Sequence, residues 1–442
     1  MKKYIWCLWL IFAIALAGYF GVVLFVKEDK NEFLIGDASH GHFQIEMSCD
    51  TCHSSAFGGQ DVLQDACVTC HAKELEEAHD SHPKKKFTDP REAYRIEILD
   101  ARYCVSCHTE HQEEQTRNMG VTLPDDYCYH CHEEVGEERE SHKDLPFDSC
   151  ASAGCHNFHD NRALYENFLA ENANQPWIKE IAQISPPNFA KRKSKPSINL
   201  KRSVYQKQIS LHPDIASHWQ ASSHAAGGVD CGGCHVEENT DGWIEKPGIE
   251  QCQNCHENEV KTYTEGKHGM RLAKTLKSDL SAMTTDQSGL EFGADSHGIE
   301  HGCNTCHAAH DFNTTSAGAD ACLNCHADEH SLAFNASSHA TLWNKEIAGE
   351  IPEGQGVNCA TCHMPSMKLG SGENAVMSVQ HNQNWNLRPN EKMIRSVCMN
   401  CHSLEFSIDA LADSELIKNN FSKKPGTHIE SIDWALKRVK KD

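Results

Sequence analysis

The pattern of apolar and polar positions divides the chain into three parts. An uncharged, mostly apolar run of 23 residues extends from Tyr4 to Val26, directly behind Lys2 and Lys3. A run of this length can cross a bilayer as one helix. The long middle part alternates short apolar stretches with segments rich in Gly, Asp, Asn and Ser, which favour turns. It predicts loops and scattered short helices, with little or no sheet.

The third part is a predicted helix at the C-terminus. Thr427 and Glu430 have the spacing of a capping box, which starts a helix. The apolar residues that would share one face of this helix are Ile429, Ile432, Leu436 and Val439.

The N-terminal run has two interpretations, a membrane anchor and a signal peptide. Ala15-Leu16-Ala17 resembles a cleavage site. The apolar run continues to Val26, however, so cleavage would leave an apolar stub, and this favours an uncleaved anchor. Lys2 and Lys3 would keep the short end in the cytoplasm. We therefore expect a single-pass protein of the bacterial inner membrane, with everything from about Lys27 onward in the periplasm.

Composition limits the size of any hydrophobic core and the choice of partners. The chain has 442 residues, of which only 39% are hydrophobic, and its 63 acidic against 41 basic residues give a net charge of -22. A surface this acidic excludes duplex nucleic acid as an expected partner, because that ligand needs a cationic surface. Cationic redox proteins and small redox molecules remain as partner classes.

The most informative residues are 23 Cys and 30 His, far more than a chain of this length usually has. Ten times they form Cys-x-x-Cys-His, and an eleventh site has four residues between its cysteines. Each motif is named below by its first cysteine. The motifs are Cys49-Cys52-His53, Cys67-Cys70-His71, Cys104-Cys107-His108, Cys128-Cys131-His132, Cys150-Cys155-His156, Cys231-Cys234-His235, Cys252-Cys255-His256, Cys303-Cys306-His307, Cys322-Cys325-His326, Cys359-Cys362-His363 and Cys398-Cys401-His402.

This motif is the attachment site of c-type haem. Its two thiols form thioethers with the porphyrin, and the adjacent histidine is the first axial ligand of the iron. Structural zinc needs four ligands per ion and gives no reason for a histidine after every second cysteine. A disulfide framework would not require the histidine. The sequence therefore predicts eleven covalently attached haems c, and only Cys7, inside the apolar run, is left over.

The second axial ligands must come from the 19 histidines outside the motifs. In the first half, five candidates face five haems, with His40, His79 and His130 to spare; the candidates are His42, His82, His111, His142 and His159. His111 and His159 each follow a motif in the pattern Cys-His-x-x-His. In the second half there are more free histidines than predicted haems, because His212, His218 and His428 are also present. The expected pool there is His224, His268, His297 or His301, His310, His330, His339 and His381.

Motif spacing predicts the domain organisation. The predicted parts are a cytoplasmic stub with the transmembrane anchor (1–30), a pentahaem domain (31–160), a basic, Pro-containing linker (161–216) and a hexahaem domain with the C-terminal helix (217–442). With about 40 residues per haem, the porphyrins must supply much of the buried apolar surface. The expected fold is a mainly α multihaem cytochrome c whose core is built around covalent haems, and which does not fold without them.

Two family resemblances follow from these motifs. Residues 40–160 resemble the class III, low-potential multihaem cytochromes c in their closely spaced motifs and partner histidines. Residues 217–442 resemble the hydroxylamine oxidoreductase and octahaem cytochrome family, with six haems rather than eight. The residues that carry the second resemblance are Ser223-His224, Gly266-Lys267-His268-Gly269 and Cys359 to Pro365.

The chain also departs from the active members of these families. Hydroxylamine oxidation in that family uses a tyrosine from the C-terminal region, but the last tyrosine here is Tyr263. The Cys-x-x-Cys-Lys of pentahaem nitrite reductases is absent from the sequence. The anchor resembles that of small membrane-tethered quinol dehydrogenases, yet His53 is followed by Ser54 and Ser55 instead of their methionine.

Two functions remain. The first is electron transfer in respiration, between the inner membrane, with quinol as a candidate donor, and periplasmic redox proteins. The second is an oxidoreductase that acts on a small nitrogen or sulfur oxyanion at a five-coordinate haem in the C-terminal domain. The surplus of histidines and the missing active-haem signatures favour electron transfer.

Overall fold

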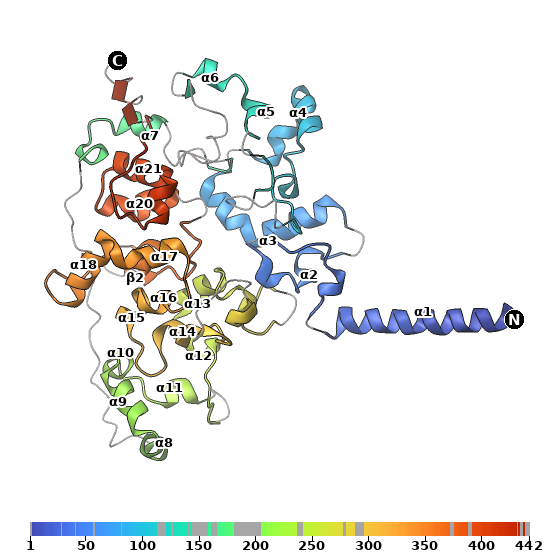
Figure 1. Ribbon diagram of the computed structural model, residues 1–442, viewed down its shortest axis with the longest axis horizontal. Helices are drawn as coiled ribbons and strands as arrows, with labels where there is room; N and C mark the ends of the chain where they lie inside the picture. The colour runs from blue at the N-terminus through green and yellow to red at the C-terminus, as the bar shows by residue number, and fades with distance from the viewer. Residues whose placement is uncertain are drawn as a thin grey trace. The chain divides into compact units, whose positions relative to one another are not determined.

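The structure is a computed structural model of the whole chain (Figure 1). It describes residues 2–27, 29–39, 41–55, 58–80, 82–112, 121–124, 127–139, 142–143, 158–160, 166–180, 205–236, 242–276, 280–287, 296–371, 375–387, 391–430, 432–433 and 436–437.

The chain forms two compact units, which are described separately. Unit 1 comprises 1–76, 83–124 and 274–281, and unit 2 comprises 77–82, 125–273 and 282–442. These units divide the chain at other places than the predicted domains, whose boundaries stay predictions. The helices that begin in unit 1 are α1 (Lys2–Phe25), η1 (Asn31–Phe33), η2 (Phe43–Ile45), α2 (Cys49–Cys52), α3 (Gln60–Ala78), η3 (Lys84–Thr88), η4 (Pro90–Glu92), α4 (Ala93–Ile98) and η5 (Cys104–Ser106).

Unit 2 is a succession of short helices. They are α5 (Tyr129–His132), α6 (Val135–Glu138), α7 (Glu166–Glu171), η10 (Pro176–Ile178), α8 (Gln206–Leu211), α9 (Pro213–Ala221), α10 (Ser223–Ala226), α11 (Gly232–His235), α12 (Ile249–Gln253), α13 (Glu257–Thr264), η12 (Met270–Leu272), η13 (Thr285–Gln287), α14 (Cys303–His307), α15 (Thr314–Gly318), α16 (Asp320–Leu323), α17 (Glu329–Ala333), η15 (Phe334–Ala336), α18 (Ser338–Ile347), α19 (Cys359–His363), α20 (Glu391–Ser396), η17 (Cys398–Asn400), α21 (Leu404–Ala412) and α22 (Ser414–Lys418).

Sheet structure is limited to one hairpin in the part of the chain that the structure describes. Strand β1 (Ser366–Leu369) pairs antiparallel with β2 (Val376–Val379), with Ser366 opposite Val379. The prediction of a mainly helical chain with little sheet is confirmed.

Helix α1 coincides with the predicted apolar run. It is long and apolar enough to cross a membrane, a property that an anchor and a signal sequence share. Most of its large side chains are exposed. Its last turns differ, because Phe20 packs edge-on against Phe33 with ring centres 5.5 Å apart and Val23 is buried. The C-terminal end of α1 is thus attached to the segment that follows it.

The main hydrophobic core of unit 2 lies around α20 and α21, which are in contact (Figure 1). Its buried residues are Ile178, Ile394, Leu404, Ile408, Leu411 and Ile432. Ile429 and Leu436 pack against it, so three of the four apolar positions predicted for the C-terminal helix face this core. Val439 lies outside the described residues.

A segment that the sequence assigned to the linker also belongs to this core. Ile178 of η10 is 2% exposed, and Phe168 and Trp177 pack beside it. The average composition of 161–216 is basic and gives no indication of these three apolar residues. Residues 166–180 are therefore a packed part of unit 2 rather than a solvated connector.

We expect Ile408→Ala to destabilise unit 2 by about 2–5 kcal/mol, because the substitution leaves a cavity at a fully buried site. Leu332→Ala is the control, since Leu332 is 58% exposed, and should cost about 0.5 kcal/mol or less. Denaturant unfolding of the haem-loaded protein, followed by circular dichroism, measures both. Equal effects of the two substitutions would contradict this assignment of the core.

Candidate haem sites

The Cys-x-x-Cys-His motifs form single turns of helix. In seven of them the backbone N–H of the histidine donates to the carbonyl of the first cysteine, at 2.8–3.0 Å. The other three described motifs lie within α3, α14 and α19. Residues i, i+3 and i+4 share one face of a helical turn, so two thiols and one imidazole project to the same side. This arrangement can hold one planar group by its edge and its metal from one face.

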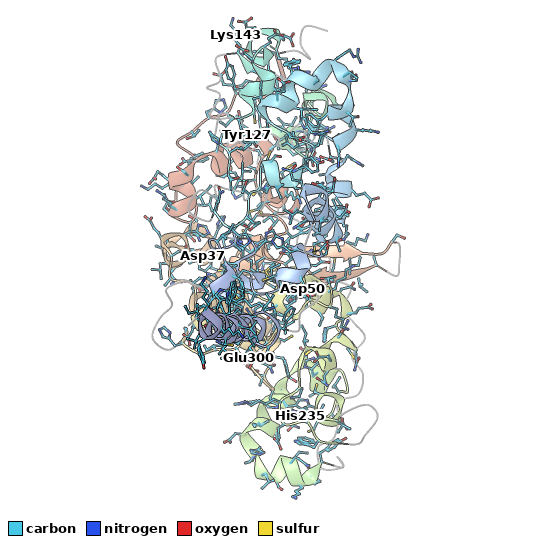
Figure 2. All side chains as sticks on the ribbon, turned by 90° about the vertical axis from the view of Figure 1, so that its right-hand side faces the viewer. Asp37, Asp50, Tyr127, Lys143, His235 and Glu300 are labelled. Atoms are coloured by element: carbon cyan, nitrogen blue, oxygen red, sulfur yellow. The ribbon has the colours of Figure 1, made fainter. Side chains whose placement is uncertain are left out.

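Six motif histidines of unit 2 each lie opposite a histidine from outside the motifs. Figure 2 labels one of them, His235 of α11. The pairs, with the distances between ring centres, are His235 with His310 (5.8 Å), His256 with His224 (5.9 Å), His307 with His381 (6.2 Å), His326 with His268 (6.0 Å), His363 with His330 (6.2 Å) and His402 with His339 (6.2 Å).

Two further pairs involve motifs of the first half. His71 lies 5.9 Å from His42 in unit 1, and His132 lies 6.0 Å from His82 in unit 2. All four residues are among the iron ligands that the sequence predicts. The structure therefore brings eight motif histidines into pairs.

The spacing of these pairs fits a haem iron with two histidine ligands. Two imidazoles on opposite sides of one metal ion have ring centres about 6 Å apart, because each metal–nitrogen bond is about 2 Å and each ring centre lies about 1 Å further out. Face-to-face contact brings two rings closer than this, as between His82 and Phe158, whose ring centres are 4.1 Å apart. The eight pairs thus leave room for one metal ion and a thin planar group.

The protonation state of the buried rings agrees with a ligand role. Burial lowers the pKa of His268 and that of His363 to about 4. Burial also lowers the pKa of His224, His307 and His339. A neutral imidazole is the form that binds a metal ion, since its lone pair is free.

Two of the partner histidines occupy identical local structures. The sequence Ala-Ser-Ser-His-Ala occurs at 221–225 and again at 336–340. In each copy the first serine, Ser222 or Ser337, is buried and caps a helix by accepting a backbone N–H. His224 and His339 then stand on the first turn of α10 and α18. The repeated pentapeptide is therefore a sequence signal for these two histidine positions.

His111 and His310 share another local structure. Both follow a motif in the pattern Cys-His-x-x-His, and both have left-handed backbone, with φ of 61° and 74°. Residues other than glycine adopt this conformation rarely, and they do so mostly at functional sites. His310 is paired with His235, whereas His111 donates from Nδ1 to the carbonyl of Gly36 at 2.9 Å.

In several paired histidines the ring nitrogen Nδ1 also donates a hydrogen bond. Nδ1 of His42 donates to Glu110 and Nδ1 of His71 donates to Glu74, both at 2.6 Å. Burial raises the pKa of Glu110, but hydrogen bonds from His42 and Ser39 outweigh it and lower that pKa to about 2. Partners of this kind orient a ligating imidazole and change its basicity.

The cysteines place successive motifs side by side. In unit 2 the Cys303 thiol raises the pKa of the Cys252 thiol, and the Cys359 thiol raises that of the Cys322 thiol, so each of these two pairs lies close together. The other neighbouring pairs are close enough for their charges to interact: Cys234 with Cys252, Cys306 with Cys322, and Cys362 with Cys401. The motifs from Cys231 to Cys398 are consequently neighbours in sequence order. In unit 1 the Cys104 thiol likewise raises the pKa of the Cys67 thiol.

The remaining histidines that the sequence predicts as second ligands have other neighbours. His297 pairs with no motif histidine among the described residues; its side chain is 63% exposed and donates to Asp286 at 2.8 Å. His301 has its ring centre 5.3 Å from that of His268, beside an existing pair. His159 donates to Asp80 at 3.1 Å, and His142 follows α6. The Cys150 motif, with Cys155 and His156, lies outside the described residues, as does His40.

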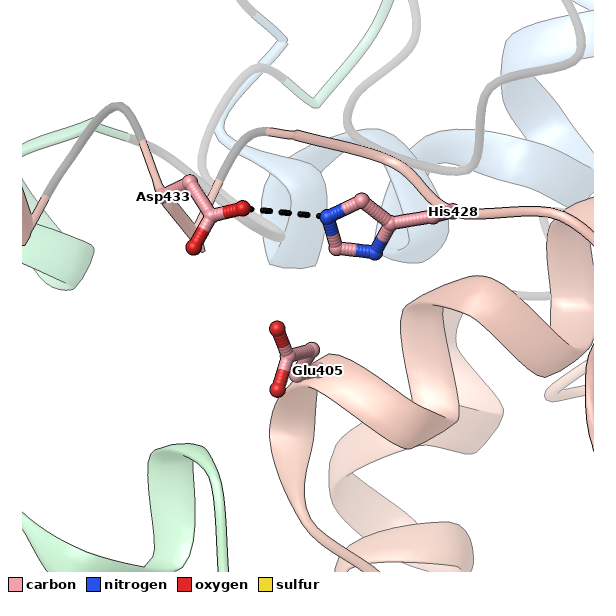
Figure 3. A group of neighbouring side chains, drawn as sticks. All are labelled: Glu405, His428 and Asp433. Carbon is pink, nitrogen blue, oxygen red and sulfur yellow. Dashed lines mark hydrogen bonds and ion pairs between the residues drawn. The ribbon is translucent and has the colours of Figure 1, made fainter.

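One further cluster of titratable groups lies at the C-terminal segment (Figure 3). His428 contacts Asp409 and Asp433 at 3.0 Å each, and Lys179 contacts Asp433 at 2.8 Å and Glu405 at 3.1 Å. Glu405, His428 and Asp433 could hold a cation, but the ammonium of Lys179 already lies within ion-pair distance of both carboxylates. The cluster is an ion-pair network that ties 427–433 and η10 to α21.

Comparison with known protein families adds one result. Residues 41–133 match the family described as cytochrome c3. The match supports the resemblance of the N-terminal part to class III cytochromes c over residues 41–133. A domain similar to cytochrome c3 implies c-type haem and supports a role in electron transfer. No curated protein matches the chain, and the resemblance of 217–442 to the hydroxylamine oxidoreductase family stays a prediction.

The His428 network predicts a pH-dependent contact. Asp409 and Asp433 raise the pKa of His428 from 6.5 to about 9. A raised pKa means that the stabilisation is fully present below pH 6.5 and is lost as pH rises through about 9. Because the His428 side chain is 44% exposed, water screens the contact, and we expect it to contribute about 1 kcal/mol or less.

Hydrogen exchange of the 427–437 segment measures this contact. Protection of the Ile429 N–H, which donates to Asp409 at 2.8 Å, should be stronger in the wild type than in His428→Gln at pH 6. The difference should vanish at pH 10, where His428 is neutral. A difference that stays constant between these pH values would show that the charge of His428 does not hold the segment.

Proposed function

We propose that this chain is an undecahaem c-type cytochrome that transfers electrons between the inner membrane and periplasmic redox partners. The observation that carries the proposal is the set of eight histidine pairs, in which a motif histidine faces a second histidine across about 6 Å. A bound haem c would supply one-electron redox chemistry at each pair. The chain supplies both axial ligands, the thioether cysteines and the low-dielectric surroundings.

The pairs also favour electron transfer over catalysis. All six motif histidines between 217 and 442 face a partner, so the second axial position of each proposed site is filled by the chain itself. Binding of an oxyanion substrate to an iron needs an open position. This argues against the alternative, a five-coordinate haem in the C-terminal part.

The ordered contacts between motifs support the same function. An electron carrier needs its redox sites in an unbroken series, and the cysteine contacts connect the Cys231 to Cys398 motifs one after another. The Cys67 and Cys104 motifs are joined in the same way in unit 1. We therefore expect electrons to pass along the chain in motif order.

An internal analogy extends the assignment to the Cys49 motif. His310 follows the Cys303 motif in a Cys-His-x-x-His pattern and is paired with His235, two motifs earlier. His111 has the same pattern after the Cys104 motif and the same left-handed backbone. Two motifs earlier lies Cys49. His111 is accordingly the proposed partner of His53, and both belong to unit 1.

The N-terminal helix gives the proposal its location. Helix α1 presents exposed Tyr4, Trp6 and Trp9 near one end and packs Tyr19 and Phe20 against 31–33 at the other. Aromatic residues at both ends of an apolar helix suit the two interfaces of a bilayer. The proposed arrangement is an uncleaved anchor with the haem-binding units in the periplasm and quinol as a candidate electron donor.

Replacement of a proposed second ligand should change the spin state of one haem. His339→Ala removes the partner of His402, so one iron should become high-spin and bind carbon monoxide, while the number of covalent haems stays the same. His297→Ala is the matched control, because His297 is exposed and bonded to Asp286. Visible and EPR spectra measure the spin state. A high-spin signal in His297→Ala alone would reverse the two assignments.

Removal of residues 2–25 should release the protein from the membrane. A variant with a cleavable signal peptide in place of α1 should appear in the soluble periplasmic fraction with its full haem content. The wild type should remain in the membrane fraction and retain its N-terminus. A native chain that starts near Gly18, as found by mass spectrometry, would instead identify α1 as a signal peptide.

A further inference from the structure

The pair at the Cys67 motif differs from the other seven in the partners of its Nδ1 atoms. His42 Nδ1 donates to Glu110 and His71 Nδ1 donates to Glu74, each at 2.6 Å. The two glutamates approach from different elements, since Glu74 belongs to α3 and Glu110 follows the Cys104 motif. Both rings of this pair thus donate to a carboxylate.

Each of the other seven pairs has at least one ring with a neutral partner or none. His82, His235, His330 and His381 donate to backbone carbonyls of Phe158, Ile244, Ile417 and Val379. Burial lowers the pKa of His268, and the uncharged side chain of Gln383 raises it to a smaller degree. Nδ1 of His224 and that of His402 are buried without a hydrogen-bond partner in the described structure.

Glu110 is held in place by more than the ring it faces. Its carboxylate also accepts the backbone N–H of Ser39 at 2.7 Å and the Ser39 hydroxyl at 2.8 Å. Ser39 is buried, and the Glu110 side chain is 30% exposed, whereas the Glu74 side chain is 51% exposed. Water screens a charge more strongly at the more exposed site. Of the two carboxylates, Glu110 therefore acts more strongly on its imidazole.

A carboxylate at Nδ1 affects a metal bound at the opposite ring nitrogen. It draws the Nδ1 proton toward itself, which increases the electron density and basicity of the imidazole. A more basic ligand stabilises the more positive, oxidised state of an iron, so its reduction potential falls. A carbonyl partner has this effect to a smaller degree, because it carries only a partial charge.

We propose that Glu110 and Glu74 are positioning residues that act through His42 and His71 to hold the haem of the Cys67 motif at a low reduction potential. The inference rests on the histidine pairs of the proposed function. A low reduction potential would make this haem, which lies inside the region that matches cytochrome c3, one of the last to accept an electron. Reduction of this haem adds one electron, which the donor or a mediator supplies.

Substitution of each glutamate by glutamine tests the inference on the full-length, haem-loaded protein. Glutamine can still accept the hydrogen bond but carries no charge. In Glu110→Gln one component of the redox titration should move to higher potential. At its former midpoint the ratio of reduced to oxidised haem should rise at least tenfold, which corresponds to about 59 mV for one electron. Glu74→Gln should give a smaller shift in the same direction, and the double variant a larger one.

Glu97→Gln is the matched control, because it removes one charge from α4 at an exposed position of unit 1 and should shift no component. Haem content and EPR g-values of each variant separate a change of potential from a loss of structure. Unshifted titrations in Glu110→Gln, Glu74→Gln and the double variant, with haem content and low-spin spectra intact, would overturn the inference.

Two more variants distinguish a failure of this inference from a failure of the proposed function. Should Glu110→Gln lose haem, the single variant Glu74→Gln decides, since its half-exposed side chain tolerates the change. His42→Ala should convert one haem to high spin. An unchanged low-spin spectrum there would overturn the ligand pair itself, and with it the tuning by Glu110.

Discussion

The separation of about 6 Å between a motif histidine and its partner is the constraint on which the rest of this structure depends. With an iron bound between them as proposed, neither ring of a pair could approach the other to pack, and neither could move far away without opening the site. In most pairs the two histidines are distant in sequence, as His307 and His381 are. The chain must therefore cross itself repeatedly to bring them together. This requirement explains a fold of many short helices and turns, because long regular elements would not return the chain so often.

The same constraint explains why a hydrophobic core is scarce. Among the described residues of unit 2, the compact apolar clusters lie around α20 and α21 and, as a smaller group, around Phe334. Elsewhere, buried polar residues such as Ser222 and Ser337 fix the helices that carry partner histidines. With haems bound as proposed, most of the cohesion would come from ligation and covalent attachment, and less from the burial of side chains against one another.

Much of this architecture could be predicted from the sequence, because Cys-x-x-Cys-His is a local motif. A single helical turn accounts for its spacing, and the apolar run at the N-terminus is local as well. The pairing of distant histidines is not a local property. His297 and His301 looked equal in sequence, and only the structure distinguishes them from His268. Residues 166–180 show the opposite case, since their basic surroundings conceal the apolar residues that pack into unit 2.

Histidine also shows how strongly the surroundings decide the chemistry of one residue type. Burial lowers the pKa of His363 to about 4, whereas two aspartates raise that of His428 to about 9. The first ring is a neutral ligand candidate at every physiological pH, and the second is a cation that holds a chain segment. Sequence counts of histidine combine these roles, and only contacts separate them.

The contacts between cysteines of successive motifs have a consequence for biogenesis. The thiols of Cys252 and Cys303 lie close enough to shift each other's pKa, as do those of Cys322 and Cys359. In an oxidising compartment two such thiols are prone to join as a disulfide. If the chain matures in the periplasm as proposed, a polypeptide that reached this shape before haem attachment would be exposed to wrong cross-links. Maturation would then have to keep these sulfurs reduced, or fill each site before its neighbour approaches, so the order of assembly would matter.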